Sequence, residues 1–401
     1  MPSSRTSRTA ISVAFLANGL LFGSWVSRIP ALQERLALSE STLGFALLCL
    51  GGGALAAMLW TGWLLGRVES RKVIACGAMG ASLLLLFPAW VPGPWSLSLV
   101  LALLGASVGV TDIAMNSQGA AHEERFHRPI LSSLHGLWSA GGLIGAALGG
   151  LAAARAIPVG LHFAVAAVAA AGVTLAVYPW FLENRQEPGG EAPPGWQWPP
   201  VALAGLGVIA FSVFMAEGAI ADWSALYLRD HLGTGDGFAA SGYAAFSLCM
   251  AGVRFSGDWL RGRLPAQRLL VLAASLALAG MVLALLAGNA PGSVVGFALT
   301  GVGLASIFPT VVAIASRHPG ISAHTGIAAV ACAGYTGFLL GPAVIGFVAQ
   351  AASLPVALGM VAGLCAVVIP LAFTVPRGGK RGAATAASSS RAPGDRTDRR
   401  P

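Results

Sequence analysis

The sequence predicts an all-α integral membrane protein in which twelve transmembrane helices form two parallel-repeat six-helix bundles. Three observations support this fold class: the composition, the recurrence of long apolar stretches, and a repeat that divides the chain. Apolar residues make up 56% of the 401 residues and charged residues only 10%, whereas a soluble domain carries about 25% charged residues. So few charges cannot cover a water-exposed surface, but they suit a protein surrounded by lipid.

Apolar stretches long enough to cross a bilayer as helices, at about 20 residues each, recur along the whole chain. Backbone groups inside lipid must be hydrogen-bonded within the protein, which restricts such segments to helices or a closed barrel. The stretches are continuous and do not alternate with polar residues, which argues against a barrel. The twelve stretches cover residues 10–29, 42–65, 73–90, 95–121, 130–154, 158–180, 200–226, 238–260, 267–289, 292–316, 324–350 and 355–375.

The chain also repeats itself at an offset of 196 residues. Matches at one common offset, spread over most of each half, indicate two copies of one unit. In a membrane protein, a parallel duplication places a pathway at the interface between the copies. The matches are Gly66-Arg67 with Gly262-Arg263, Ala102-Leu103-x-Gly105 with Ala298-Leu299-x-Gly301, and the glycine pattern starting at Gly141 with the one starting at Gly337.

The repeat and the loop composition divide the chain into five segments. A short N-terminal segment (1–9) precedes the first bundle (10–182), and a linker rich in proline and glycine (183–199) leads to the second bundle (200–375). The last segment (376–401) is expected to be a disordered, basic tail. Residues 10–29 are expected to be a permanent span and not a cleaved signal peptide. The five cysteines lie inside spans without metal-like spacing, so they are expected to be packing residues and no metal site is expected.

Positive charge is concentrated on one side of the predicted membrane protein. With twelve spans both termini lie on the same side, and the loops of that side and the tail hold most of the arginines and lysines. The opposite side holds Arg28, Arg35, Arg155 and Arg229. The positive-inside rule therefore places both termini in the cytoplasm and the protein in the cytoplasmic (inner) membrane. The arginines are scattered over loops and form no basic face, so no nucleic-acid partner is expected.

The loops after the second and eighth stretches carry a related basic pattern. The first reads Gly62-Trp63-Leu64-Leu65-Gly66-Arg67-Val68-Glu69-Ser70-Arg71-Lys72, and the second reads Arg254-Phe255-Ser256-Gly257-Asp258-Trp259-Leu260-Arg261. With the six-plus-six spans, this pattern resembles the loop motif of the major facilitator superfamily, and the resemblance covers about residues 10–375. It implies a gate formed by Gly62, Arg67, Arg71, Lys72, Asp258 and Arg261. Gly66 stands where the family has an acid, and these charges can alternatively serve orientation alone.

A narrower resemblance lies in the fourth and fifth spans. The segments Asp112-Ile113-Ala114-Met115-Asn116-Ser117-Gln118 and Ser132-Ser133-Leu134-His135-Gly136-Leu137-Trp138-Ser139-Ala140-Gly141-Gly142 are similar to the uncharacterised inner-membrane YbjJ branch of that superfamily. This branch is in turn similar to the fucose–proton symporters. The resemblance gives no substrate for this chain.

Four ionisable side chains lie well inside the spans: Asp112, Glu217, Asp222 and Arg254. An ionisable group at bilayer depth is costly, so it is a functional hypothesis by default. Asp112 shares one helix face with Gly105, Gly109 and Asn116. A carboxyl on such a face can bind and release a proton near neutral pH, or it can make a structural hydrogen bond to a neighbouring helix.

Glu217 and Asp222 lie in the same span but about 140° apart around the helix, so they do not share a face. Glu217 is expected to face the pathway, and it joins Asp112 as a candidate proton carrier. Asp222 is expected to be an outer-gate or structural acid. Arg254 is expected to belong to the gate, where it reaches the membrane surface or pairs with Asp258 four residues further on.

Polar and aromatic residues in five of the spans are candidates for contact with a solute. Aromatic rings with polar tips suit sugar-like or amphipathic ligands, and they equally suit membrane interfaces. His135 and Ser139 share one helix face, and His135 can equally be a packing histidine. The candidates are Asn18, Trp25, Asn116, His135, Trp138, Ser139, Tyr243 and Tyr335.

The sequence thus predicts a secondary transporter that moves a small solute by alternating access. The expected driving force is a proton gradient, without a cofactor, and the expected state is a monomer in the lipid bilayer. The stretch His122-Glu123-Glu124-Arg125-Phe126-His127 approaches a zinc-protease motif, but its second histidine is one residue late and it is expected in a loop, so an enzyme is not expected. Two alternatives stay open: proton-driven efflux of amphipathic compounds, and a membrane solute sensor that does not transport.

Overall fold

The computed structural model describes residues 3–127, 130–183, 201–319, 321 and 323–375. Within the helices, the side chains of residues 62, 132, 257–259, 261–262, 323–325 and 327–328 are not described. Beyond Glu183, the predicted linker lies outside the described residues, as does the predicted tail. The described part of the chain is helical and contains no strand.

Most of the α-helices are long, and a few short helices and helical turns lie between them. The long and short α-helices are α1 (Ser4–Val26), α2 (Ile29–Arg35), α3 (Glu40–Leu65), α4 (Ser70–Leu85), α5 (Pro94–Phe126), α6 (Leu131–Ala154), α7 (Val159–Ala176), α8 (Ala204–Leu226), α9 (Asp236–Ala239), α10 (Ser241–Arg263), α11 (Ala266–Leu286), α12 (Ala290–Leu304), α13 (Ile307–Ala315), α14 (Ala323–Ala351) and α15 (Leu354–Phe373). The turns are η1 (Phe87–Ala89), η2 (Tyr178–Trp180), η3 (Val201–Leu203) and the π-helical η4 (Tyr227–His231).

Among the described residues, twelve helical segments are long and apolar enough to span a membrane, which confirms the predicted fold class. Their bounds differ in places from the prediction. Helix α1 begins at Ser4, earlier than expected, because the hydroxyl of Ser3 caps it by accepting the backbone N–H of Thr6. Helix α5 continues to Phe126, so residues 122–126 are its last turn and not a loop.

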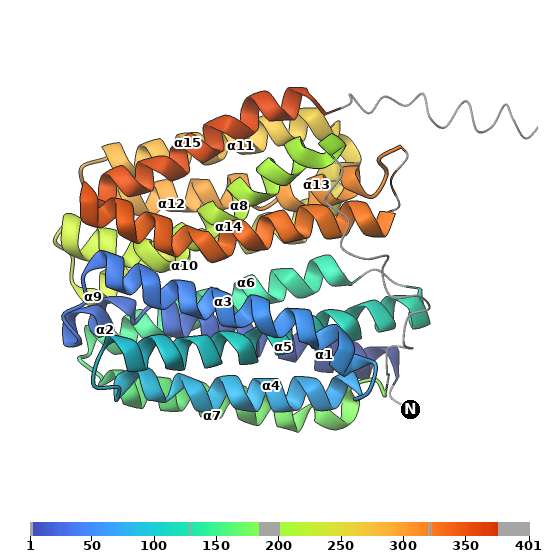
Figure 1. Ribbon diagram of the computed structural model, residues 1–401, viewed down its shortest axis with the longest axis horizontal. Helices are drawn as coiled ribbons and strands as arrows, with labels where there is room; N and C mark the ends of the chain where they lie inside the picture. The colour runs from blue at the N-terminus through green and yellow to red at the C-terminus, as the bar shows by residue number, and fades with distance from the viewer. Residues whose placement is uncertain (1–2, 128–129, 184–200, 320, 322, 376–401) are drawn as a thin grey trace, which may run out of the picture.

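The two predicted bundles form two halves of the molecule (Figure 1), with α1–α7 in one half and α8–α15 in the other. The internal repeat extends to individual contacts. A Cβ added to Gly105 in α5 would overlap the carbonyl oxygen of Leu50 in α3, and a Cβ added to Gly301 in α12 would overlap that of Phe246 in α10. Gly301 lies 196 residues after Gly105, and Phe246 lies 196 residues after Leu50, so the same close helix crossing occurs once in each half.

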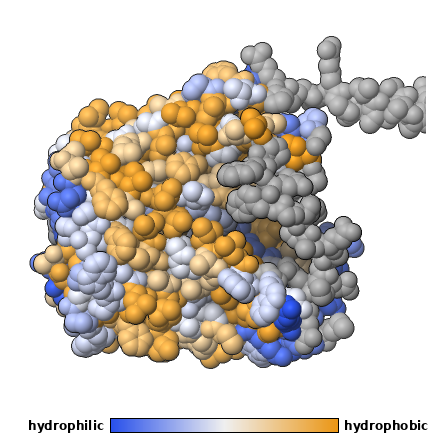
Figure 2. All heavy atoms as spheres, in the orientation of Figure 1, coloured by the Kyte–Doolittle hydropathy of each residue, from blue (hydrophilic) through white to orange (hydrophobic). Residues whose placement is uncertain are grey.

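The surface has the distribution expected of a protein embedded in lipid. Figure 2 shows apolar residues across the long flank and hydrophilic residues gathered toward its two ends. Large apolar side chains are exposed on helices of both halves, for example Leu59 at 76% and Leu286 at 78%. Such exposure would be costly in water but not in a bilayer.

Two helix pairs make most of the seam between the halves: α3 packs on α14, and α6 packs on α10; α9 also packs on α6, and α2 packs on α8. We call the end of the molecule where α1 begins and α15 ends the terminal face, and the opposite end, with α2 and α9, the far face (Figure 1). Near the far face a Cβ on Gly44 would lie 2.9 Å from the carbonyl oxygen of Pro342, and a Cβ on Gly150 would lie 2.9 Å from that of Gly237. The halves are therefore in backbone contact there, and the far face is closed.

Candidate functional site

Arg254 links the two halves in the middle of the seam. Its Nη2 atom lies 2.7 Å from Oε1 of Glu217 in the same half, and its Nη1 atom donates a hydrogen bond of 3.0 Å to Oγ of Ser139 in the other half. The ionic bond is charge-assisted and therefore strong. The sequence predicted neither partner, because α8 and α6 are far from α10 along the chain. The side chain of its predicted partner Asp258 lies outside the described residues.

Asp112 makes a second link across the seam. One carboxylate oxygen accepts a hydrogen bond of 3.3 Å from the Asn116 amide, and the other accepts one of 3.5 Å from the hydroxyl of Tyr335 in α14. Tyr335 is 196 residues after Ser139, so the two links use equivalent positions of α6 and α14. The other ends of the two links, Arg254 in α10 and Asp112 in α5, are not related by the repeat, so the links are alike only at this one position.

An aromatic group lies on the α6–α10 seam beside these links. The Trp138 indole donates a hydrogen bond of 2.9 Å to Oδ1 of Asn18. The ring of Phe22 lies 5.4 Å from that of Trp138 and 6.0 Å from that of Tyr243. A Cβ added to Gly142 would lie 3.1 Å from the Tyr243 hydroxyl, so this tyrosine reaches from one half to the backbone of the other.

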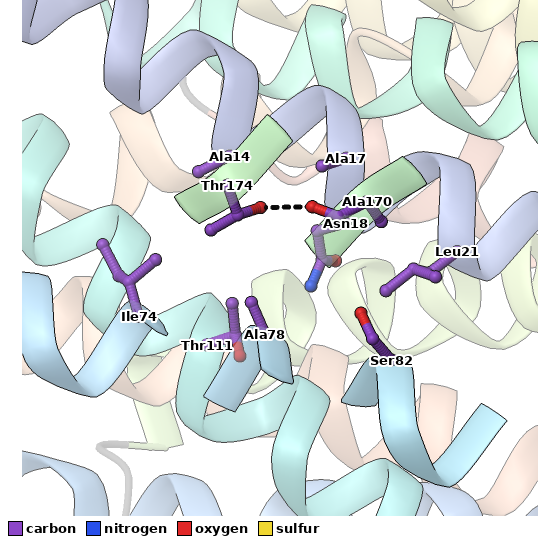
Figure 3. Close-up of a pocket in the computed structure, with 10 residues that line it drawn as sticks. All are labelled: Ala14, Ala17, Asn18, Leu21, Ile74, Ala78, Ser82, Thr111, Ala170 and Thr174. Carbon is purple, nitrogen blue, oxygen red and sulfur yellow. Dashed lines mark hydrogen bonds between the residues drawn. The ribbon is translucent and has the colours of Figure 1, made fainter. Parts of the chain in front are cut away.

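The candidate residues Asn18, His135 and Trp25 are held by packing within the first half. Figure 3 shows Asn18 and Ser82 among the residues that line one small cavity, which has a volume of about 10 Å³. The His135 ring packs edge-on against Phe15 at 5.4 Å, and its backbone carbonyl accepts a bond from Ser139. Trp25 is buried beside Phe163, nearer the far face, so it is not among the residues that join the halves.

Asp222 stands apart from both links. It lies in α8 beyond Glu217 toward the far face, and only 4% of its surface is exposed. Within the described part of the chain its carboxyl has no hydrogen-bond or ion-pair partner. Glu217 binds Arg254 and Asp222 does not, in keeping with the prediction that the two acids point in different directions.

The basic loop at the terminal face is held by acids that the sequence analysis did not identify as its partners. Arg71 binds Glu69 and Glu183, both at 2.7 Å, and Lys72 lies 3.4 Å from Glu69. The hydrogen bond from Arg71 holds the pKa of Glu69 below its ordinary value. Arg67 instead lies over the ring of Trp63, 4.0 Å from its centroid.

These loop contacts all lie within the first half or join it to the start of the linker. Gly62 and Arg261, two of the other predicted gate residues, lie in α3 and α10, but nothing is described of the surroundings of Gly62 or of the Arg261 side chain. The assignment of a gate at the terminal face therefore stays a prediction.

Gln118 is a buried polar residue whose role the sequence analysis missed. Its amide nitrogen donates to Oγ of Ser70 and to the carbonyl oxygen of Leu182, both at 2.7 Å, and its Oε1 atom accepts the N–H of Leu182 at 3.0 Å. It thus ties α5 to the start of α4 and to the chain that leaves α7. The signal was present, because an uncharged amide stood in an apolar span beside Asp112 and Asn116.

In the described part of the chain, twelve membrane-length helices in two repeated halves, joined by partly buried polar links, define a polytopic membrane protein built like a secondary transporter. The family model described as "Major Facilitator Superfamily" matches residues 10–334. The chain belongs to this superfamily.

Relatives and solved structures agree with this assignment. The chain is 34% identical to "Uncharacterized transporter y4wD" of Sinorhizobium fredii, over 90% of this chain and 97% of that protein. It is 31% identical to "Membrane protein MosC" of Rhizobium meliloti, over 88% of this chain and 86% of that protein. Among solved structures, the nucleoside transporter NupG (D323A mutant) matches with a TM-score of 0.71 at 13% identity, over 92% of this chain and 99% of that one. FucP in its outward conformation matches with a TM-score of 0.63 at 17% sequence identity, over 92% of this chain and 98% of that one.

Proposed function

We propose that this protein is a proton-coupled secondary transporter that moves a small polar solute through the bacterial inner membrane by alternating access. It acts as a monomer, with both termini in the cytoplasm and no cofactor. The observation that carries the proposal is the position of Arg254, which holds Glu217 of its own half and Ser139 of the other half at once. A partly buried charge pair that also joins the two halves couples protonation to their relative movement.

The coupling follows from the chemistry of the two links. Protonation of Glu217 removes the charge that holds Arg254, and a solute with hydroxyl or carboxyl oxygens then competes for the guanidinium. Asp112 offers a second carboxylate, with only a long 3.5 Å bond from Tyr335 across the seam. Breaking these links lets the halves rock about the centre, which is how parallel-repeat transporters alternate access.

The positive-inside argument supports assigning the terminal face to the cytoplasm. The far face would then be the outer face, and the closed contacts at Gly44 and Gly150 would shut the pathway from outside. Arg71 and Lys72, bound to acids at the terminal face, would belong to the inner gate. We place the chain in the YbjJ branch on its span-four and span-five motifs, which supports a polar solute by analogy with FucP and NupG.

A second candidate, proton-driven efflux of amphipathic compounds, is favoured by one observation. The rings of Phe22, Trp138 and Tyr243 form a continuous aromatic group on the seam. Flat apolar faces with polar edges bind amphipathic molecules as well as they bind sugars. The two candidates differ in the solutes that would move protons.

The test is proton movement in proteoliposomes across a library of sugars, nucleosides, amino acids and amphipathic drugs. Wild type is compared with Asp112→Asn and Glu217→Gln, with Glu124→Gln at the exposed end of α5 as the matched control. We expect a solute-dependent proton flux in wild type and the control that is lost in at least one of the two variants. Flux retained in both variants would remove these carboxyls as proton carriers while leaving a transporter. Solute uptake without proton flux would contradict the coupling.

A further inference from the structure

Asp222 is a buried carboxyl of α8 that lies between Glu217 and the far face. All residues of α8 and η4 from Gly218 to Leu228 are buried, so this part of the helix has no face toward lipid or water. Asp222 is 4% exposed, and within the described residues its carboxyl has no hydrogen-bond or ion-pair partner. A polar group in such a position requires an explanation, because most buried polar groups are hydrogen-bonded.

The enclosure depends on the closed seam. Next to Asp222, the ring of Trp223 lies against Gly346 of α14, which in turn meets Gly44 of α3 in the other half. On another side, Tyr243 of α10 touches Gly142 of α6, also in the other half. Helix α2 of the first half packs on α8 as well. Opening the far face separates these contacts and admits water toward Asp222.

The ionisable groups on the surrounding helices leave Asp222 without a cation. Tyr243 of α10 is close enough to Asp222 to interact electrostatically, and it carries no charge near neutral pH. The guanidinium of Arg254 is bound to Glu217, and the hydroxyl of Tyr335 in α14 faces Asp112. Arg28, at the start of α2, donates to the carbonyl oxygen of Ile157.

The remaining ionisable groups near this end are placed elsewhere. Arg229, Asp230 and Glu34 interact with one another near the far-face surface, and His231 stacks on Tyr227. Asp236, the first residue of α9, is partly exposed, and Cys365 of α15 is buried as a thiol. None of these supplies a positive charge to Asp222.

A carboxylate cannot stay ionised in such a place, because removing an unpaired charge from water costs far more than protonating it. The carboxyl is therefore neutral while the far face is closed and is free to ionise when that face opens to water. We infer that Asp222 is a proton-binding site loaded from the far face, and that its protonation is required for the far face to close. The inference rests on the proposed function only in taking the proton as the coupling ion.

The proton balance is simple. In the open state the ionised carboxylate of Asp222 takes one proton from water on the far side, and no bond other than O–H forms. Closure then buries the neutral acid. One proton bound per closure means that the ratio of open to closed molecules rises up to about tenfold per pH unit, over the range in which Asp222 is ionised when open and neutral when closed.

The test measures the distance between two spin labels at the far face by pulsed electron resonance, in a background without the native cysteines. Exposed Arg155 at the end of α6 and Leu286 at the end of α11 carry the labels. In wild type, we expect the long-distance, open population to grow as pH is raised from about 5 to 8. In Asp222→Asn, and in Asp222→Ser as a second variant in case the first misfolds, the closed population should persist at every pH. Glu124→Gln, at the exposed end of α5, serves as the control and should keep the pH response.

Two results would overturn the inference. One is an open population in wild type that does not change with pH; the other is a pH response in both Asp222 variants equal to that of wild type. The measurement needs no solute, so it separates this inference from the proposed function. If no solute in the transport assay moves protons but the labels still respond through Asp222, the proposed proton-coupled transport fails and the proton site stands.

Discussion

Gln33 and Arg229 occupy equivalent positions of the two repeats, 196 residues apart, and they bond to each other. The Arg229 Nη2 atom donates to Oε1 of Gln33 at 3.2 Å. The acids that follow them, Glu34 and Asp230, are also equivalent, and Arg229 binds both: Nε donates to Asp230 at 2.5 Å and Nη1 lies 3.7 Å from Glu34. A residue that contacts its own repeat counterpart lies on the axis relating the halves, so one guanidinium joins them at the far face.

Arg229→Gln should loosen this far-face contact without abolishing it. The Glu34 side chain is 76% exposed, and exposed ion pairs contribute only about 0.2–1 kcal/mol. We therefore expect the ratio of open to closed molecules to rise about two- to fivefold, measured with the same spin-labelled pair at positions 155 and 286. High salt should have the same effect on wild type and little on the variant. An unchanged ratio at low salt would show that the contact carries no closure energy.

The repeated glycine crossings should be matched in their sensitivity. Because a Cβ on Gly105 would overlap the carbonyl of Leu50, and one on Gly301 that of Phe246, alanine at either glycine forces the helices apart. Overpacking of this kind typically costs about 1–3 kcal/mol. Thermal unfolding in detergent should show a lower midpoint temperature for both variants. The midpoint of Gly172→Ala should not fall, because no atom lies within 4 Å of a Cβ added there. A loss at Gly172 as large as at the crossings would contradict this account.

Much of the fold could be predicted because it depends on local properties of the sequence. Each span is a long apolar run, and the lipid environment allows such a run few structures other than a helix. The match between Gly105 and Gly301 reflects a shared structure as well as a shared origin, because each glycine permits the same close approach to a neighbouring helix. The ends of helices were less predictable: α5 runs on to Phe126 because Glu123 accepts the backbone N–H groups that begin α6, an interaction that depends on the folded chain.

The candidate site was predictable as a set of residues but not as a set of contacts. Asp112, Glu217 and Arg254 were identified because ionisable groups are rare inside apolar spans. Sequence spacing offered Asp258 as a partner for Arg254, whereas the fold brings Glu217 and Ser139 to it from two other helices. The Arg229 contact was missed because both of its residues lie near span ends, where charges are common. Comparing the two repeats position by position would have revealed it.

Gln118→Leu should be one of the most destabilising polar substitutions in the first half. It removes the hydrogen bonds of the Gln118 amide to Ser70 and Leu182, and it leaves the backbone N–H and carbonyl of Leu182 without this partner in a buried place. A buried group left unsatisfied costs about 1–3 kcal/mol, so a loss of about 2–3 kcal/mol or more is expected in denaturant titration. Gln350→Leu, at an exposed glutamine of α14, serves as the control. Equal stability of the two variants would show that Gln118 is dispensable.

The pair formed by Glu217 and Arg254 should be needed for function more than for stability. Removing one member of a buried ion pair leaves the other charge uncompensated and costs about 3 kcal/mol, whereas replacing both with apolar residues is often nearly neutral. We therefore expect Glu217→Leu and Arg254→Leu each to lower the unfolding free energy, and the double variant to be more stable than either. All three should lose solute-dependent proton flux, because the double variant restores packing but not the link to Ser139. If the double variant loses as much unfolding free energy as the two single variants together, the two side chains act independently. If the double variant retains solute-dependent proton flux, this pair is not part of the coupling mechanism.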